Sequence, residues 1–340
     1  MEGTLDGGVV RMGGDARQRF YDSRGYGRPT DEGVALAPVE AAHLLFRGDL
    51  DAVSGMDFQE FLTVSDRPVI RFLVYKDFRE RGFYLSPARE GWVNDADTTA
   101  DLVVYPQGKG PWDDEIAYRV RVVGERESVA TTDLGPVVLA VVDEESEITY
   151  LDTSRPRMDG ATEYEPSLQI SGDLLEDRAI LWNPPDDLYE RGFYGQRLAG
   201  RGAESGPLQL SLLEAAFLAR RGTLDFDVFP EAVIERGRQV EGERFDHRLS
   251  VYSKLRRAGC VPKTGFKFGA DFRTYSNVES VANLGHSGHL VRVLPAEYAF
   301  SPRELSLYVR LAGGVHKRMV FALTDTNGDI DWLSVERLRP

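Results

Sequence analysis

The sequence predicts an α+β fold made by tandem duplication of one two-subdomain unit, in which a small N-terminal α/β piece precedes a C-terminal mixed sheet with helices. Two observations predict this architecture. Segments of similar sequence recur at an offset of about 170–182 residues, and each copy alternates short amphipathic helices with strand-like apolar runs. A polar stretch at 153–165, which contains Pro156 and is followed by Pro166, indicates the join between the copies.

The first recurring element is a short amphipathic helix that stops at a glycine. Residues 39–51 resemble residues 213–225, and the apolar stripes end before Gly48 and Gly222. Glycine commonly follows the last turn of a helix because it adopts the left-handed backbone found there. Upstream of this helix, a Phe-Tyr pair is matched between the copies, at 20–21 and at 193–194.

A second helix, two strands and a closing hairpin follow in each copy. The paired segments are the helices 74–82 and 251–259, the strands 101–105 and 271–275, the strands 119–122 and 290–293, and the hairpins 137–151 and 319–335. In the second hairpin, Asn327 and Gly328 between apolar strands predict a type I′ turn. A further helix is expected from the capping box Ser301 to Glu304 up to Gly313.

Composition excludes several classes of protein. The chain of 340 residues has one cysteine, Cys260, so neither an intramolecular disulfide nor a multi-cysteine metal site is available. We expect that cysteine to be a small buried residue. No apolar run approaches the ~20 residues of a membrane span, and residues 1–3 open no signal peptide. We therefore expect a soluble, cytoplasmic protein with no membrane partner.

The charged residues indicate adaptation to salt. Asp and Glu number 55 against 41 Lys and Arg, which gives a net charge of −14, and only 6 of the basic residues are lysines. Carboxylates hold water, and high salt screens their mutual repulsion, so this composition is typical of a halophile. A GC-rich genome, which also favours Arg over Lys, is the alternative explanation.

The charge is distributed unevenly along the chain. Residues 251–340 hold 13 Lys and Arg against 8 Asp and Glu, a net of +5, so residues 1–250 carry −19. The overall acidity argues against a nucleic-acid ligand, whereas the basic last third argues for one.

The duplication supplies an internal control for functional residues. Tyr275 has a counterpart in Tyr105, whereas the first copy has no equivalent of His286 or Lys317. All three second-copy residues are expected at strand edges in the basic third, where a rigid sheet can support a site. Tyr105 is then expected to be a structural relic.

Three motifs follow one another in the second copy. They are the segment 263–275, the pair His286 and Ser287 before the strand 290–293, and the segment 309–312 before the basic residues at 316–318. Together they resemble the archaeal tRNA-splicing endonucleases, in particular the fused two-repeat form. The resemblance implies a cofactor-free enzyme that cuts precursor tRNA at bulge–helix–bulge splice sites.

The resemblance also implies that Tyr275, His286 and Lys317 form a ribonuclease site that needs no metal. Cleaving RNA through its own 2′-hydroxyl requires a base at that hydroxyl, an acid at the 5′ leaving oxygen and a cation for the phosphorane. The family assigns these roles in that order, with 2′,3′-cyclic phosphate and 5′-hydroxyl products. A phenol of pKa about 10 is a weak base at neutral pH, so either nearby cations lower the pKa of Tyr275 or it only orients the hydroxyl.

Two arginines are implied as RNA-binding residues. In this family a pair of guanidinium groups holds an extruded bulge base between them, and the matching positions are Arg310 and Arg337. Members vary between Arg and Trp at the second position, and a solvated terminal arginine is the alternative for Arg337. We expect Trp332 in the core or an interface rather than stacked on RNA.

An acidic hairpin turn in the first copy is the expected assembly loop. Its acidic residues are Asp143, Glu144, Glu145 and Glu147. In the resembling family this loop inserts into a basic cleft of a partner unit. That family builds four-unit assemblies, so the resemblance implies that a two-repeat chain forms a homodimer with two active sites. A simply solvated turn is the alternative.

These inferences divide the chain into four expected subdomains. They are an N-terminal subdomain at 1–65 and an inactive, catalytic-like subdomain at 66–160, followed by an N-terminal subdomain at 161–245 and a catalytic nuclease subdomain at 246–340.

Two other functions remain as alternatives. A non-catalytic RNA-binding or structural subunit of a splicing complex would lack the three proposed catalytic residues, and a DNA endonuclease of similar sheet would use acidic metal ligands in a different pattern. No DNA partner is therefore expected. No metal is expected either, since His286 and His289 lack an acidic or thiol co-ligand and the acidic stretch 325–329 lacks the spacing of a calcium loop.

Overall fold

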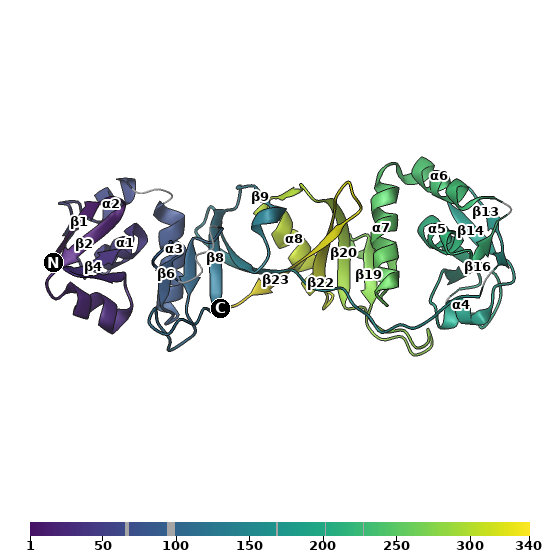
Figure 1. Ribbon diagram of the computed structural model, residues 1–340, viewed down its shortest axis with the longest axis horizontal. Coiled ribbons are helices and arrows are strands. Elements are labelled where there is room, and N and C mark those ends of the chain that lie inside the picture. The colour runs from purple at the N-terminus through teal and green to yellow at the C-terminus, as the bar shows by residue number, and fades with distance from the viewer. Residues whose placement is uncertain (65–67, 94–98, 168, 201, 227) are drawn as a thin grey trace. The chain divides into compact units, whose positions relative to one another are not determined.

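The computed structural model describes residues 1–64, 68–93, 99–167, 169–200, 202–226 and 228–340, and the chain divides into two compact units (Figure 1). The first consists of Met1–Ser154, Ala299–Ser306 and Glu336–Pro340, and the second of Arg155–Tyr298 and Leu307–Val335. The expected subdomain boundary at 65–66 lies outside the described residues. Each unit contains both helices and sheets, so the predicted α+β class is confirmed.

A five-stranded sheet with short helices begins the first unit. In sheet order its strands are β3 (Arg28–Thr30), β4 (Gly33–Leu36), β2 (Val9–Gly13), β1 (Glu2–Asp6) and β5 (Ala52–Val53). The helices are the π-helix η1 (Arg17–Asp22) and the α-helices α1 (Pro38–Phe46) and α2 (Phe58–Val64). The helix predicted within 39–51 is thus confirmed as α1, and Gly48 beyond it has the expected left-handed φ of 72°.

A second, larger sheet follows in the first unit. In sheet order its strands are β11 (Ile148–Ser154), β10 (Val137–Val142), β8 (Tyr118–Gly124), β7 (Leu102–Val104) and β6 (Leu85–Pro87). Helix α3 (Pro68–Glu80) packs on β6, β8 and β10. The short pair β9 (Val129–Ala130) and β21 (Ala299–Phe300) and the 3-10 helix η2 (Thr131–Asp133) also belong to this unit.

The second unit begins with a smaller version of the same plan. Its four-stranded sheet has the order β13 (Asp173–Leu174), β14 (Arg178–Leu181), β16 (Leu208–Ser211) and β15 (Gln196–Arg197), and β12 (Ile170–Ser171) pairs with β17 (Leu224–Asp225). Its helices are α4 (Asp186–Glu190), α5 (Leu212–Arg220) and α6 (Pro230–Glu241). The helix predicted within 213–225 is confirmed as α5.

The larger sheet of the second unit repeats that of the first. In sheet order its strands are β18 (Val261–Thr264), β19 (Phe272–Tyr275), β20 (His289–Pro295), β22 (Arg318–Thr324) and β23 (Ile330–Leu338), with the 3-10 helix η3 (Phe266–Phe268) between the first two. Helix α7 (Arg244–Arg257) packs on β18, β20 and β22 (Figure 1), as α3 packs on the corresponding strands of the first unit.

One parallel strand pair characterises each larger sheet. β8 is parallel to β10 and β20 is parallel to β22, whereas the other neighbours within each unit's larger sheet are antiparallel. A parallel pair requires a crossover connection, and the second copy uses helix α8 (Pro302–Gly313) for it. The Ser301 hydroxyl accepts the N–H of Glu304 at 3.2 Å. This bond confirms the predicted N-cap. The helix ends at Gly313, as predicted.

A buried glutamate near the start of one helix in each unit corrects the sequence alignment of the two copies. The carboxylate of Glu40 in α1 accepts the N–H of Gly27 at 2.7 Å. The carboxylate of Glu214 in α5 accepts the N–H of Gly195 at 2.9 Å. Because the two bonds have the same role, Gly195 corresponds to Gly27.

The residues before these glycines also correspond. The Arg79 guanidinium lies 4.0 Å from the ring centroid of Tyr26, and that of Arg256 lies 3.8 Å from the ring centroid of Tyr194. The predicted match of the Phe-Tyr pair at 20–21 to the pair at 193–194 is therefore wrong. Residues 20–21 lie inside η1, so their similarity to 193–194 is one of side-chain type and not of position.

Both hairpin turns are wider than the type I′ turn predicted for the second one. Gly328 has a left-handed φ of 86°, but Asn327 does not share that conformation, and the turn closes between Asp325 and Asp329. The Asp325 carboxylate stabilises this wider loop by accepting the N–H groups of Asn327 at 2.9 Å and Asp329 at 2.8 Å. Asp143 accepts two backbone N–H groups of its own turn in the same way.

Two glycines of the second unit should differ in how much their substitution lowers the free energy of unfolding. Gly195 and Gly222 have left-handed φ values of 62° and 70°, but a Cβ at Gly195 would lie 2.4 Å from the carbonyl oxygen of Gln209, whereas a Cβ at Gly222 meets nothing within 4 Å. We expect Gly222→Ala to lower the free energy of unfolding by about 1 kcal/mol, for the backbone conformation alone. Gly195→Ala should lower it by about 3 kcal/mol or more, since backbone must also move. Denaturant unfolding measures both, and equal losses would contradict the predicted steric difference.

Candidate active site

Tyr275, His286 and Lys317 meet at one edge of the larger sheet of the second unit. Strand β19 is antiparallel to β20, and β20 is parallel to β22. The C-terminal end of β19 therefore lies beside the N-terminal ends of β20 and β22. Tyr275 ends β19, His286 lies in the loop before β20, and Lys317 immediately precedes β22.

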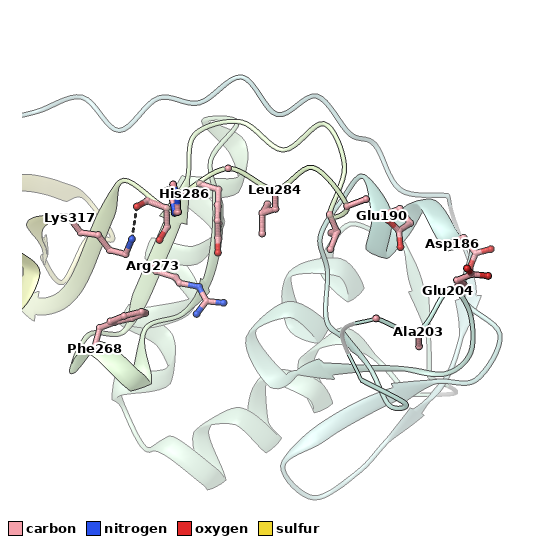
Figure 2. Close-up of a pocket in the computed structure, with 15 residues that line it drawn as sticks. Asp186, Glu190, Ala203, Glu204, Phe268, Arg273, Leu284, His286 and Lys317 are labelled. Atoms are coloured by element: carbon pink, nitrogen blue, oxygen red, sulfur yellow. Dashed lines mark hydrogen bonds between the residues drawn. The ribbon is translucent and has the colours of Figure 1, made fainter. Parts of the chain in front are cut away.

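A cleft of about 990 Å³ lies at this edge, and all three residues line it. One side carries the cationic and imidazole groups, and the other side is formed by the N-terminal part of the same unit. In Figure 2 the labelled charged and imidazole side chains form two groups on opposite sides: Arg273, His286 and Lys317 on one side, and Asp186, Glu190 and Glu204 on the other.

Tyr275 is held by aromatic packing. Its side chain is 6% exposed, so only a small part of it reaches the cleft that it lines. Its ring lies 5.7 Å from the ring of Phe193, between centroids, at an interplanar angle of 64°. This edge-on arrangement is a favoured geometry for aromatic pairs, and it restricts the directions in which the phenol can point.

Lys317 and the His286 loop are joined by a hydrogen bond. The Lys317 ammonium donates to the carbonyl oxygen of Ser287 at 2.8 Å, shown as a dashed line in Figure 2. Ser287 is buried, whereas the His286 side chain before it is exposed to solvent and can reach a bound ligand. The lysine therefore fixes the backbone of the loop that presents the histidine.

Arg273 is a cationic residue of the cleft that the sequence analysis missed. It precedes Tyr275 by two positions on β19, and its guanidinium lies 6.0 Å from the centroid of the Tyr275 ring. Alternate residues of a strand share a face, so this spacing is the signal that would have identified it. Among the described residues, its Nε has no hydrogen-bond partner and no carboxylate forms an ion pair with it.

Arg310 and Arg337 are both exposed, on α8 and β23 respectively. Arg310 is not among the residues that line the cleft of the described chain. Their role in RNA binding stays a prediction. Trp332 on β23 is 9% exposed and belongs to the apolar core of the second unit, so its expected core position is confirmed.

The first-unit tyrosine at the corresponding place has a different environment. Tyr105 is buried, and its hydroxyl donates to the Ser86 hydroxyl at 2.9 Å. Burial raises the pKa of this phenol above its ordinary value. The side chain is therefore part of the unit's packing, as expected of a residue with a structural role.

The acidic turn of the first unit is solvent-facing. Glu144, Glu145 and Glu147 are exposed, and Arg126 forms an ion pair with Glu144. The Asp143 carboxylate is used within the turn, as described above. Three of the four predicted assembly residues are thus exposed, one of them in an ion pair, and their function stays a prediction.

Side chains suited to hold a metal ion do not gather in the described part of the chain: no group of three or more His, Cys, Asp or Glu has that arrangement. Cys260 is buried, as expected, and burial raises the pKa of its thiol to about 11. Among the described helices, none has the length and apolarity to cross a membrane.

Two family models match the chain. The model described as the N-terminal domain of tRNA intron endonuclease matches twice, at residues 1–62 and 170–229, and the model of the catalytic C-terminal domain matches residues 245–332. The double match agrees with the predicted duplication, and the catalytic match covers the sheet edge where Tyr275, His286 and Lys317 meet. The class of protein is therefore an RNA endonuclease built from a repeated α+β unit.

Full-length relatives agree with this class. Proteins named tRNA-splicing endonuclease from Natronomonas pharaonis and Haloarcula marismortui are 61% and 60% identical to the chain, each over 100% of both sequences. A protein of the same name from Methanococcoides burtonii is 35% identical over 95% of both. The chain belongs to the tRNA-splicing endonuclease family. The first two relatives come from halophilic archaea, which agrees with the salt adaptation predicted from composition.

Proposed function

We propose that the chain is a cytoplasmic tRNA-intron endonuclease that cuts precursor tRNA at bulge–helix–bulge splice sites. Cleavage uses the RNA's own 2′-hydroxyl as the nucleophile, requires no metal, and leaves 2′,3′-cyclic phosphate and 5′-hydroxyl ends. The observation that carries the proposal is the cleft that Tyr275, His286 and Lys317 line together. The names of the relatives support precursor tRNA as the substrate.

The proposed chemistry needs one proton transfer at the attacking 2′-hydroxyl and one at the departing 5′-oxygen. Tyr275 accepts the proton of the attacking 2′-hydroxyl or orients that hydroxyl, and the new bond forms between the 2′-oxygen and phosphorus. His286 in its protonated form donates a proton to the departing 5′-oxygen as the old phosphorus–oxygen bond breaks. Lys317 and Arg273 stabilise the extra negative charge of the phosphorane between these two events.

The second unit performs catalysis and the first supports it. We assign catalysis to residues 246–340 and a scaffold role to residues 66–160, with 1–65 and 161–245 as the two N-terminal subdomains. Tyr105 supports this division because its buried hydroxyl donates a hydrogen bond to the Ser86 hydroxyl. The alternative of a non-catalytic RNA-binding subunit is disfavoured because such a subunit has no need of an exposed histidine beside an anchored lysine.

Arg310 and Arg337 are the proposed base-binding residues. Both guanidinium groups are exposed and therefore free to stack on an extruded base of a bulge. RNA recognition by this enzyme would then rest on the shape of the bulged helix and a few splayed bases rather than on sequence.

The mechanism predicts metal-independent cleavage with defined product ends. A bulge–helix–bulge RNA incubated with the protein and EDTA should be cut at the bulges, and product analysis should find 2′,3′-cyclic phosphate and 5′-hydroxyl groups. Replacing the attacking 2′-hydroxyl by hydrogen at one bulge should block cutting there, because the nucleophile is removed. Cleavage that stops in EDTA, or 3′-hydroxyl products, would contradict the mechanism.

His286→Ala and a matched control test the acid in the same assay. His286→Ala should lose cleavage while its affinity for RNA stays within about twofold of the parent. The control is His316→Asn, because His316 is exposed, lies outside the cleft lining and has a left-handed φ of 54° that asparagine tolerates. Cleavage by His286→Ala near the parent rate would remove it from the role of acid.

Arg273→Val tests whether the Arg273 guanidinium contacts RNA. The variant inserts the residue that the first unit has at the corresponding strand position, Val103. RNA affinity should fall about tenfold, the magnitude expected for one charge-assisted hydrogen bond. The slope of log affinity against log salt should become shallower by about 0.7–0.9, because one fewer phosphate contact releases counterions. Arg220→Ala on the exposed face of α5 is the control and should change neither quantity. An unchanged slope for Arg273→Val would exclude a phosphate contact.

We further propose that two chains form a homodimer through the acidic turn at 143–147, which docks against a basic surface of the partner chain. The exposure of Glu144, Glu145 and Glu147 supports this, as does the Asp143 side chain, which stabilises the turn from within. The glutamates are then the docking charges, and the aspartate keeps their backbone in place.

If the homodimer forms as proposed, removing the charges of the glutamates should abolish the dimer without unfolding the chain. The chain of 38.0 kDa should sediment as a dimer of about twice that mass. Changing Glu144, Glu145 and Glu147 together to Gln should give a monomer that circular dichroism shows to be folded, because Asp143 still holds the turn. Asp329→Asn in the other hairpin is the control. A monomeric parent, or a dimer that survives the triple change, would refute the assigned role.

A further inference from the structure

Phe193 has a backbone conformation that side chains seldom adopt. Its φ is 49°, in the left-handed region that favours glycine. The first unit has a glycine at the corresponding place, Gly25, with a φ of 64°. The correspondence follows from the adjacent residues, since Gly25 precedes Tyr26 and Phe193 precedes Tyr194. A phenylalanine in such a position raises the question of what its ring contributes, because strain of this kind collects at functional sites.

The Phe193 ring contacts the proposed base. It is 1% exposed and meets Tyr275 edge-on at 5.7 Å. Tyr275 belongs to β19, whereas Phe193 belongs to the turn after α4, so the contact joins the N-terminal part of the second unit to the strand that carries the site. The Lys263 ammonium lies 4.8 Å from the centroid of the same phenylalanine ring.

Lys263 fixes the backbone of this turn. Its buried ammonium donates to the carbonyl oxygens of Phe193 at 3.2 Å and Gly195 at 2.9 Å, and to the Glu214 carboxylate at 2.7 Å. All three N–H donors of the ammonium are thereby used. Because Lys263 is on β18, directly beside β19, it ties the Phe193 turn to the sheet at the place where Tyr275 ends its strand.

Glu214 completes the connection. Besides Lys263 and the Gly195 N–H, its carboxylate accepts the N–H of Ser211 at 3.0 Å and the hydroxyl of the same serine at 2.9 Å. Lys263 lowers the pKa of this buried carboxyl to about 2, so it stays ionised with the lysine as its partner. The pair is fully satisfied, which is the condition under which a buried ion pair can specify one arrangement.

At the positions that correspond to Phe193 and Lys263, the first unit has other residues. Strand register places Ser86 opposite Val103, as Lys263 is opposite Arg273, so a serine occupies the position of the lysine. Without a lysine beside it, Glu40 has its pKa raised to about 7 by burial, although it makes the same backbone hydrogen bonds as Glu214. The second unit thus combines a phenylalanine, a lysine and a tyrosine whose hydroxyl has no hydrogen-bond partner among the described residues. The first unit combines a glycine, a serine and a tyrosine whose hydroxyl is hydrogen-bonded.

We propose that Phe193, fixed by the Lys263–Glu214 pair, is a positioning residue for Tyr275. Its ring confines the phenol to one orientation at the edge of the cleft, so that the hydroxyl meets the 2′-hydroxyl of the bound RNA. The inference rests on the proposed function, in which Tyr275 contacts the nucleophile. It adds that the N-terminal subdomain of the second unit takes part in catalysis through this contact.

The central variant is Phe193→Gly, which inserts the first-unit residue and relieves the left-handed strain. Its single-turnover cleavage rate at saturating protein should fall at least 30-fold, while RNA affinity stays within about twofold and circular dichroism shows a folded chain. Phe193→Leu should restore part of the rate by refilling the volume next to Tyr275. Phe217→Leu, at a buried phenylalanine of α5, is the packing control and should cleave at close to the parent rate.

A double-mutant cycle separates positioning from a general loss of structure. Phe193→Gly should have no further effect on the residual rate of Tyr275→Phe, because it acts through the hydroxyl already removed. An equal fold-loss in both backgrounds would show that the ring matters only for packing, and a parent-like rate for Phe193→Gly alone would also overturn the inference. If Tyr275→Phe itself cleaves normally, the proposed function fails instead, so the two failures are distinguishable.

Discussion

In the second unit, the Glu214 carboxylate accepts hydrogen bonds from the backbone of Ser211 and Gly195 and pairs with the ammonium of Lys263. One buried charge thereby fixes the start of α5, the turn after α4 and the strand β18 relative to one another. An isolated buried carboxylate is strongly disfavoured, so these three elements are constrained to meet wherever the glutamate is. The Phe193 turn, and through it the surroundings of Tyr275, depend on this constraint.

The second constraint is the direction of three strands. His286 and Lys317 are 31 positions apart in sequence, and Tyr275 lies on a strand of opposite direction, yet the antiparallel–parallel sequence of β19, β20 and β22 brings all three to one sheet edge. Parallel pairing requires the crossover that contains α8. Helix α8, which is capped by Ser301, lies in the connection from β20 to β22. It therefore helps to place Lys317, which follows the helix, beside His286, which precedes β20.

Much of this was predictable because it depends on local or periodic signals. The duplicated organisation, α1, α5 and the N-cap at Ser301 follow from apolar periodicity, internal similarity and capping chemistry. The three residues of the cleft come from the resemblance of their motifs to the archaeal tRNA-splicing endonucleases. The turn at 325–329 was not predictable from the Asn-Gly pair, because the Asp325 side chain stabilises a wider loop. Phe193 and Lys263 were missed because their contacts with Tyr275 and Glu214 join residues distant in sequence, and because an aromatic pair suggested the wrong alignment.

The charge distribution has a physical consequence for RNA binding by an acidic chain. At molar salt the Debye length is about 3 Å, so the net charge of −14 exerts little repulsion beyond contact distance. What then matters is which cations can touch a phosphate. Lys263 is paired with Glu214, and Arg248 with Asp271, so neither is available.

Lys317 and Arg273 differ from these paired cations. Within the part of the chain that the structure describes, neither forms an ion pair with a carboxylate, and both line the cleft. The carboxylates of Asp186, Glu190 and Glu204 line the same cleft without reaching them. A phosphate entering between the two sides therefore meets cations whose charge is not already compensated. In the proposed function, RNA binding by so acidic a protein depends on this local lack of pairing rather than on the total charge.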